Sequence, residues 1–169
     1  MVIKYILILM IFSISILIGN SMANKYKGRV LELKEFKSAL NLLKAKIRYT
    51  YEPIPEIFSE IANKFENNVG DVFRISKEKM VGNTAGSVWE SVIEEYSFVN
   101  ISKEDRKILK GLGKLLGKTD KNGQISEIEL TEQFLDKQIE QAESERTKNE
   151  KLYKTLGGIV GAAIVIILV

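Results

Sequence analysis

The chain has 169 residues, of which 45% are apolar and 28% charged, and its 25 basic and 22 acidic residues give a net charge of +3. It contains neither Cys nor His, which excludes disulfides and thiolate chemistry and removes the commonest metal ligand and general base. Basic and acidic residues are interspersed, so nothing indicates a nucleic-acid-binding stripe. Composition therefore favours a protein that is not an enzyme and carries no cofactor.

Both ends of the chain are apolar. Residues 5–24 contain no charge, and at ~1.5 Å per residue they reach about 30 Å, enough for one hydrocarbon core. Residues 152–169 reach about 27 Å if Lys154 snorkels toward the interface. The sequence thus predicts transmembrane segments at 1–24 and 152–169, with a charged domain at 25–151 between them.

Basic residues flank both apolar ends on the side of the charged domain. They are Lys25, Lys27, Arg29, Lys148, Lys151 and Lys154. Cytoplasmic flanks of membrane spans are enriched in Lys and Arg, so we expect the domain to face the cytoplasm. A cleaved signal peptide ending near Ala23 is the alternative, and it would make the protein secreted and tail-anchored. Within the second span, Gly157 and Gly161 form a G-x-x-x-G pattern typical of closely packed membrane helices.

The charged domain is predicted to be all-α, with about six helices. Apolar residues spaced 3, 4, 3, 4 give the first helix one buried face: Leu33, Phe36, Leu40, Leu43 and Ile47. Pro53 and Pro55 end this helix and begin the next. The first and last helices are expected to continue into the terminal spans.

Local signals divide the rest of the domain into helices. Asn67-Asn68 and Gly82-Asn83 mark turns, Thr84 is a helix cap, and Ser102 with Asp105 forms a capping box. A fifth helix is predicted to end at Gly117, with an apolar face made of Ile108, Leu109, Leu112, Leu115 and Leu116. The last helix begins near Asp120, and its apolar face is Ile125, Ile128, Phe134, Leu135, Ile139 and Ala142. Trp89 and Tyr49 lie on apolar helix faces, which predicts core or interface positions.

Three near-motifs fail on their chemistry. Residues 118–129 match a 12-residue calcium loop except at the first position, where Lys118 stands in place of a carboxylate. A calcium-responsive membrane sensor is therefore kept only as an alternative. Gly113 and Gly117 enclose three residues rather than the four of a phosphate-binding loop, and Gly111-x-Gly113 follows no predicted strand.

Four strings occur in order along the chain. They are Ile47-Arg48-Tyr49 with Pro53-Ile54-Pro55-Glu56; Val88-Trp89-Glu90-Ser91; the segment from Leu109 to Gly117, followed by Asp120 and Gln124; and the segment from Lys151 to Gly157. Together these strings resemble the stage III sporulation protein AB family of endospore-forming bacteria. Glu52, where a small hydroxyl residue is more usual, and Val92-Ile93 depart from the family pattern.

The resemblance implies more than the residue patterns do. Family members are non-catalytic membrane proteins of the mother cell, and their helical domain is similar to the cytoplasmic domains of the inner-membrane platform protein of type II secretion machines. They belong to the mother-cell-to-forespore channel, beside a secretion-type ATPase of the same operon. The expected function is a membrane scaffold that docks this ATPase, and the sequence leaves a homo-oligomer open. The residues expected to bind partners or to maintain the fold are Tyr49, Pro53, Pro55, Glu56, Trp89, Gly113, Gly117, Asp120 and Gln124.

Overall fold

The computed structural model describes the backbone of residues 2–168 and the side chains of residues 9–166. The chain forms two compact units, one made of residues 1–30 and 141–169 and the other of residues 31–140. The described residues are all-α, as predicted, and contain no strand. Their elements are α1 (Val2–Tyr49), α2 (Ile54–Lys64), α3 (Asn68–Lys79), α4 (Ala85–Glu95), α5 (Lys103–Gly111), the 3-10 helix η1 (Leu112–Lys114) and α6 (Lys121–Leu168).

Side-chain caps begin three of the short helices; Thr84 and Ser102 were predicted as caps, whereas Asn67 was predicted only to mark a turn. The Asn67 side chain accepts a hydrogen bond from the Val69 N–H at 3.0 Å and so caps α3. Thr84 caps α4 in the same way. At the start of α5, Ser102 and Asp105 exchange bonds of 3.1 and 2.9 Å, which completes the predicted capping box. Each cap satisfies backbone N–H groups that the first turn of a helix leaves without a partner.

The turn between α1 and α2 follows from its prolines. α1 ends at Tyr49, and Pro53 takes the extended N-cap position of α2 with φ −62° and ψ 150°. Pro55 lies in the first turn of α2, where its missing N–H removes no intrahelical hydrogen bond. The helix break was therefore correctly predicted, with α1 ending four residues before Pro53.

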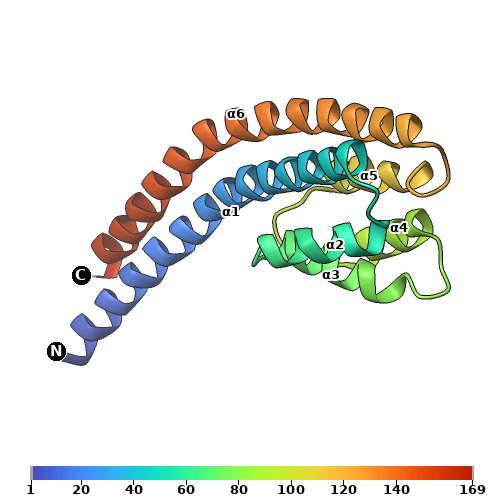
Figure 1. Ribbon diagram of the computed structural model, residues 1–169. Helices are drawn as coiled ribbons and strands as arrows, with labels where there is room; N and C mark the ends of the chain where they lie inside the picture. Colours follow the sequence, from blue (N-terminus) through green and yellow to red (C-terminus); the bar gives the residue numbers. More distant parts are fainter. Residues whose placement is uncertain (1, 169) are drawn as a thin grey trace. The chain divides into compact units, whose positions relative to one another are not determined.

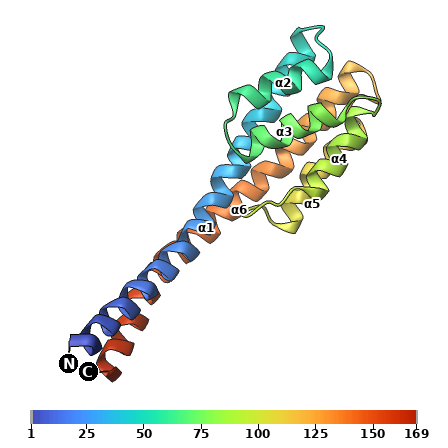
Figure 2. The same cartoon turned by 90° about the horizontal axis from the view of Figure 1, so that it is seen from below.

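In the 31–140 unit, the last part of α1 and the first part of α6 run side by side, and α2, α3 and α4 lie against them (Figures 1 and 2). The buried face of α1 is the predicted one as far as Leu43, and Leu33, Phe36, Leu40 and Leu43 are fully buried. Three aromatic side chains meet in the core. The Phe58 and Phe73 ring centroids are 4.8 Å apart, and that of Trp89 lies 5.1 Å from Phe73 and 5.9 Å from Phe58.

Three residues predicted to lie on apolar faces are exposed. α5 ends at Gly111 instead of continuing past Leu116, and the 3-10 turn that follows leaves Leu115 38% exposed. A 3-10 helix has three residues per turn, so the α-helical spacing assumed for Leu115 no longer applies. Phe134 is 43% exposed because Leu135, seven residues after the buried Ile128, takes the inward position. Tyr49, at the end of α1, is 77% exposed and is no core residue.

A buried carboxylate joins α1 to two other elements of the 31–140 unit. Glu32 is 4% exposed, and its two oxygens accept hydrogen bonds from the side-chain amides of Asn68 and Asn100, both at 3.1 Å. Burial and the neighbouring Glu32 raise the pKa of Glu35, one turn further along α1, although a hydrogen bond from Asn67 opposes the shift. The charged form of Glu35 is therefore disfavoured by folding.

Replacing Glu35 with glutamine is expected to raise the melting temperature at neutral pH. A carboxyl group whose pKa is higher in the folded than in the unfolded state binds more protons when folded, so the wild type loses stability as pH rises past the ordinary value of about 4.3. Glutamine does not titrate, and its advantage should vanish below about pH 4. Thermal melts followed by circular dichroism across this range test the prediction. The exposed Glu78→Gln variant is the control, and an equal gain in both variants would contradict it.

In the unit of residues 1–30 and 141–169, the first part of α1 and the last part of α6 lie side by side (Figures 1 and 2). A Cβ atom added to Gly19 would lie 3.1 Å from the Cα of Gly157, so the two backbones approach closely at this pair. A Cβ at Gly161 would lie 2.9 Å from the ring of Phe12. The glycines of the G-x-x-x-G pattern thus face residues 12–19 of the same chain.

Among the described residues, no helix has a stretch that is both long and apolar enough to cross a membrane. The predicted spans at 1–24 and 152–169 are therefore not supported by this part of the chain. The side chains of residues 1–8 and 167–169, which belong to these predicted spans, lie outside the described residues.

Candidate partner-binding tip

Two turns that are far apart in sequence meet at one end of the 31–140 unit. The Lys121 ammonium at the start of α6 lies 5.8 Å from the ring centroid of Tyr51, in the α1–α2 turn. Ile54 Cδ1 lies 3.5 Å from the position that a Cβ would take at Gly117. The α1–α2 turn therefore lies beside the turn that joins η1 to α6. The α3–α4 turn, in which Val81 is 88% exposed, lies at the same end (Figures 1 and 2).

We call the surface of the first two turns the tip and define it by its exposed side chains. These are Tyr49, Tyr51, Pro53, Glu56, Lys114, Leu115, Lys118, Asp120 and Lys121. Tyr49 is 77% exposed and Tyr51 is fully exposed, although side chains of this kind are normally at least partly buried. Exposed tyrosines offer a large apolar area with a hydrogen-bonding end, a combination enriched at protein interfaces.

Ion pairs connect the residues next to the tip at the end of α1. The Lys46 ammonium lies 2.5 Å from a carboxylate oxygen of Glu60 and 3.3 Å from one of Glu52. The bond to Glu60 is the main reason that the pKa of Lys46 is raised, and the same bond lowers the pKa of Glu60. Arg48 pairs with Glu129 at 2.9 Å, which links α1 to α6. The contact between Lys46 and Glu60 therefore favours the charged form of both side chains.

Two lysines of the tip, unlike Lys46, form no ion pair among the described residues. Lys114 and Lys118 are exposed, and neither has an ion pair within the described part of the chain. Lys121 contacts the face of the Tyr51 ring instead of a carboxylate. The tip thus combines unpaired positive charge with exposed aromatic area, which fits a protein partner that presents carboxylates around an apolar patch.

Five of the eleven residues predicted from the sequence maintain the backbone of the segments that form the tip. Trp89 is fully buried, and its indole N–H donates a 2.7 Å hydrogen bond to the carbonyl of Leu109, near the end of α5. Gly113 brings η1 against α4, since a Cβ there would lie 2.6 Å from the carbonyl oxygen of Gly86. These contacts fix where the segment bearing Lys114 and Lys118 leaves the core.

The turn into α6 depends on three more of the predicted residues. Gly117 has φ +69°, a conformation that residues with a Cβ rarely adopt. The Gln124 side chain accepts from the Gly117 N–H at 3.0 Å and donates to the Thr119 carbonyl at 3.1 Å. Asp120 accepts from the Gly123 N–H at 2.9 Å and so caps α6. The structure brings Gly117, Asp120 and Gln124 together in one turn.

The remaining predicted residues lie at the surface or in the other unit. Tyr49, Pro53 and Glu56 are exposed, and Pro55 is half-buried at the start of α2. Gly157 and Gly161 belong to the unit of residues 1–30 and 141–169. Tyr51, Lys114 and Lys121 were not predicted from the sequence as site residues, and Lys118 was noted only as the residue that breaks the calcium-loop pattern. The available signal was their position in, or directly beside, the two motif-bearing turns.

The segment proposed as an alternative calcium loop, residues 118–129, is mostly helical. Residues 121–129 lie within α6, and the Asp120 carboxylate is occupied as a helix cap. Across the residues that the structure describes, no three carboxylates gather as they would around a metal ion. A calcium loop needs its ligands to converge from an extended turn, and this segment has no such turn.

Comparison with known proteins identifies the family. The family model described as stage III sporulation protein AB matches residues 4–169. A stage III sporulation protein AB from Bacillus subtilis (strain 168) is 27% identical over 153 residues, which cover 89% of this chain and 90% of the relative. A solved structure of a stage III sporulation protein AB has the same fold, with a TM-score of 0.65 and 23% identity, and the match covers 72% of this chain and 98% of the solved chain. The chain therefore belongs to the stage III sporulation protein AB family.

Proposed function

We propose that this protein is a non-catalytic scaffold of the mother-cell-to-forespore channel, which docks the secretion-type ATPase of the same operon at its tip and links it to the membrane. Membership of a sporulation family supports a role in spore formation. The observation that carries the docking role is the tip itself, where the exposed Tyr51 lies beside Lys121, which has no ion pair within the described residues.

The apolar ends of the chain and the basic residues beside them support attachment to a membrane. The charge-free segments 5–24 and 155–169 supply apolar surface, and the basic residues next to them favour a domain facing the mother-cell cytoplasm. In that orientation the tip would meet a cytoplasmic ATPase. The alternative of a cleaved signal peptide would place the tip outside the cytoplasm, where it could not bind such a partner.

A tip variant tests docking directly. In the full-length protein, purified in a neutral detergent, Tyr49 and Tyr51 are changed to serine and Lys114 and Lys118 to glutamine. All four side chains are exposed, so the fold should be retained while contact area and charge are lost. If these side chains are interface anchors, their removal should cost about 2 kcal/mol or more of binding free energy. Binding to the operon's ATPase should then weaken by roughly 30-fold or more. Biolayer interferometry with immobilised ATPase provides the measurement.

A matched control comes from the opposite end of the same unit. The α4–α5 turn lies away from the tip (Figures 1 and 2), and Val99 there is 73% exposed. Val99→Ser combined with Lys103→Gln and Lys64→Gln removes exposed groups that have no ion pair in the described residues. Binding of this control should match the wild type. Equal losses in both variants, or no binding by the folded wild type, would overturn docking at the tip.

A further inference from the structure

Positive charge is concentrated in the unit made of residues 1–30 and 141–169. Between 25 and 30 and between 141 and 154 there are seven Lys and Arg residues but only three Glu. We call these seven the basic collar: Lys25, Lys27, Arg29, Arg146, Lys148, Lys151 and Lys154. Residues 31–140 contain 17 basic and 19 acidic residues, a net charge of −2. The positive net charge of the chain therefore comes from the collar's unit.

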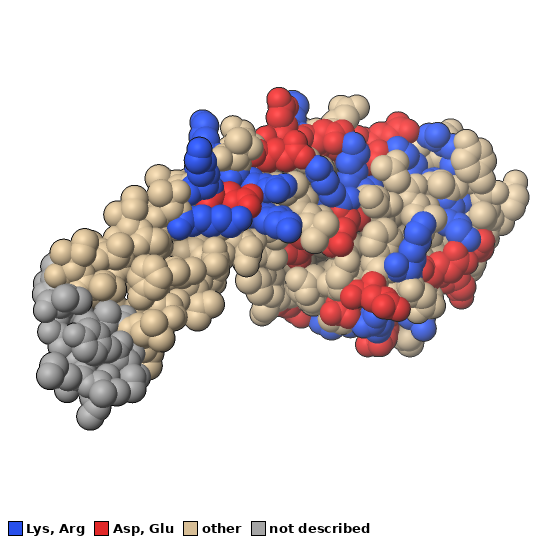
Figure 3. All heavy atoms as spheres, turned by 90° about the vertical axis from the view of Figure 1, so that its left-hand side faces the viewer, with Lys and Arg blue, Asp and Glu red and all other residues tan. Residues whose placement is uncertain are grey.

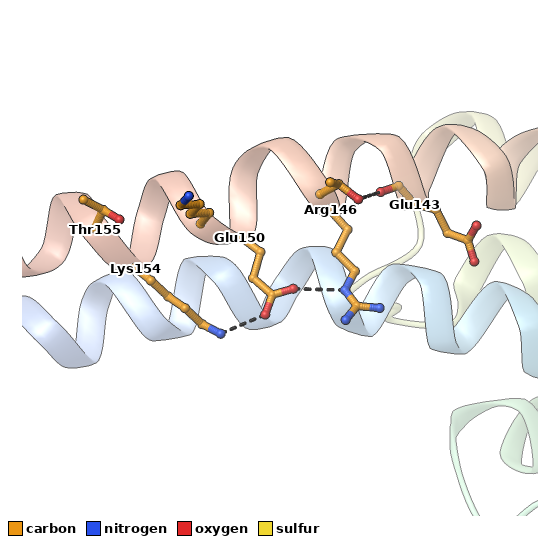
Figure 4. Close-up of a pocket in the computed structure, with 7 residues that line it drawn as sticks. Glu143, Arg146, Glu150, Lys154 and Thr155 are labelled. Carbon is orange, nitrogen blue, oxygen red and sulfur yellow. Dashed lines mark hydrogen bonds and ion pairs between the residues drawn. The ribbon is translucent and has the colours of Figure 1, made fainter.

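The three glutamates neutralise only part of the collar. Arg29 pairs with Glu145 at 2.7 Å. Glu150 receives both Lys154, at 2.8 Å, and Arg146, at 3.0 Å, as Figure 4 shows. These two bonds lower the pKa of Glu150 to about 2, so this carboxylate remains ionised and occupied at any physiological pH.

Four collar lysines are left for an external partner. Lys25, Lys27, Lys148 and Lys151 are exposed, and none has an ion pair within the part of the chain that the structure describes. They come from both helices of the unit, two from α1 and two from α6. Unpaired ammonium groups on two neighbouring helices favour a partner that carries several negative charges on one surface.

The collar borders an apolar surface. Residues 9–24 and 155–166 contain no charged side chain, and among their exposed residues are Leu9, Met10, Ile14, Leu17, Ile18, Met22, Leu156, Ile159 and Ile166. On the face shown in Figure 3, Lys and Arg side chains follow directly on the uncharged surface. Tyr26 and Tyr153 stack at this boundary, with ring centroids 5.8 Å apart. Aromatic residues between apolar and basic surface are typical of a membrane interface.

We propose that the basic collar binds the headgroups of anionic phospholipids through Lys25, Lys27, Lys148 and Lys151. This inference rests on the proposed membrane attachment and adds the class of lipid that the unit recognises. A nucleic acid would match the charge but not the apolar surface beside it, whereas an anionic lipid leaflet offers both a negative plane and hydrocarbon below it. Each lysine close to such a surface strengthens binding about fivefold.

The test uses full-length protein in neutral-detergent micelles and two fluorescent probes, phosphatidylglycerol and phosphatidylcholine. Anisotropy titrations should show binding of phosphatidylglycerol that weakens with salt, and much weaker binding of phosphatidylcholine. Changing the four lysines to glutamine should weaken phosphatidylglycerol binding on the order of 100-fold or more. The control variant changes four exposed lysines of residues 31–140 that have no ion pair in the described residues, namely Lys64, Lys77, Lys103 and Lys107.

Three outcomes would overturn the lipid assignment. The two lipids could bind equally, the control could lose as much affinity as the collar variant, or soluble glycerol 3-phosphate could displace the lipid fully, which would indicate binding of a simple anion. Failure of the proposed function is detected separately. The chain has no Cys, so a cysteine introduced at Lys77 can be labelled with an impermeant maleimide in intact cells, and labelling there would indicate export of the domain whatever lipid it binds.

Discussion

Replacing Trp89 with alanine is expected to lower the free energy of unfolding by about 3–5 kcal/mol. The Trp89 side chain is fully buried, and its ring packs against those of Phe58 and Phe73 at 5.9 and 5.1 Å between centroids. Alanine would leave a cavity bounded by helices α2, α3 and α4. The surrounding helices can relax only partly toward it, so the cavity would not close completely.

The Trp89→Phe variant separates the ring from its hydrogen bond. Phenylalanine fills most of the space but cannot donate to the carbonyl of Leu109, which Trp89 reaches at 2.7 Å. Leaving that buried carbonyl without a partner should cost about 1–3 kcal/mol, so the stability of this variant should fall between those of the wild type and Trp89→Ala. Because Trp89 is the only tryptophan, urea denaturation should be followed by far-ultraviolet circular dichroism. Equal midpoints for all three proteins would contradict the packing described for this core.

The sequence predicted those parts of the fold that depend on local chemistry. Thr84 and Ser102 begin helices because their side chains satisfy backbone N–H groups within three residues of themselves, and Asn67, which was predicted only to mark a turn, does the same. The apolar spacing of α1 placed Leu33 and Leu40 in the core for a similar reason, since one helix face is defined by the helix alone. Such features need no knowledge of other elements.

The sequence could not predict features that depend on contacts between distant segments. Leu115 is exposed because the chain changes from α-helix to 3-10 helix where Gly113 meets Gly86, 27 residues earlier. The tip is also a product of long-range contact, since Tyr51 and Lys121 are 70 residues apart. No periodicity within one helix indicates which turn will lie beside another. The motif strings contain or border the segments that form the tip, but they do not indicate that these segments meet.

Several motif residues determine where the exposed side chains of the tip lie. Trp89 holds the end of α5 through the Leu109 carbonyl, Gly113 seats η1 on α4, and Gly117 with Gln124 turns the chain into α6. Each contact restricts where Lys114 and Lys118 can lie. Under the docking function proposed above, these residues would control binding without touching the partner, because they determine the geometry of the exposed ones.

Replacing Gly113 with alanine is accordingly expected to destabilise the protein by about 1–3 kcal/mol, the usual cost of overpacking. The added Cβ would lie 2.6 Å from the carbonyl oxygen of Gly86 and 2.5 Å from Cγ of Glu90. The Glu90 side chain can rotate away, but the Gly86 carbonyl belongs to the backbone of α4 and cannot move without shifting that helix. Relief of the clash must therefore displace η1, and with it Lys114.

Gly111, two residues earlier, provides the matched control. It has helical angles of φ −54° and ψ −34°, and a Cβ added there meets nothing within 4 Å. Alanine is a better helix former than glycine, so Gly111→Ala should leave stability unchanged or raise it by up to about 1 kcal/mol. Thermal melts of the two variants should thus move in opposite directions, and only Gly113→Ala should weaken ATPase binding beyond its effect on folding. Equal shifts would mean that glycine at 113 is not required for the close approach of η1 to α4, and the positions of Lys114 and Lys118 would then need another explanation.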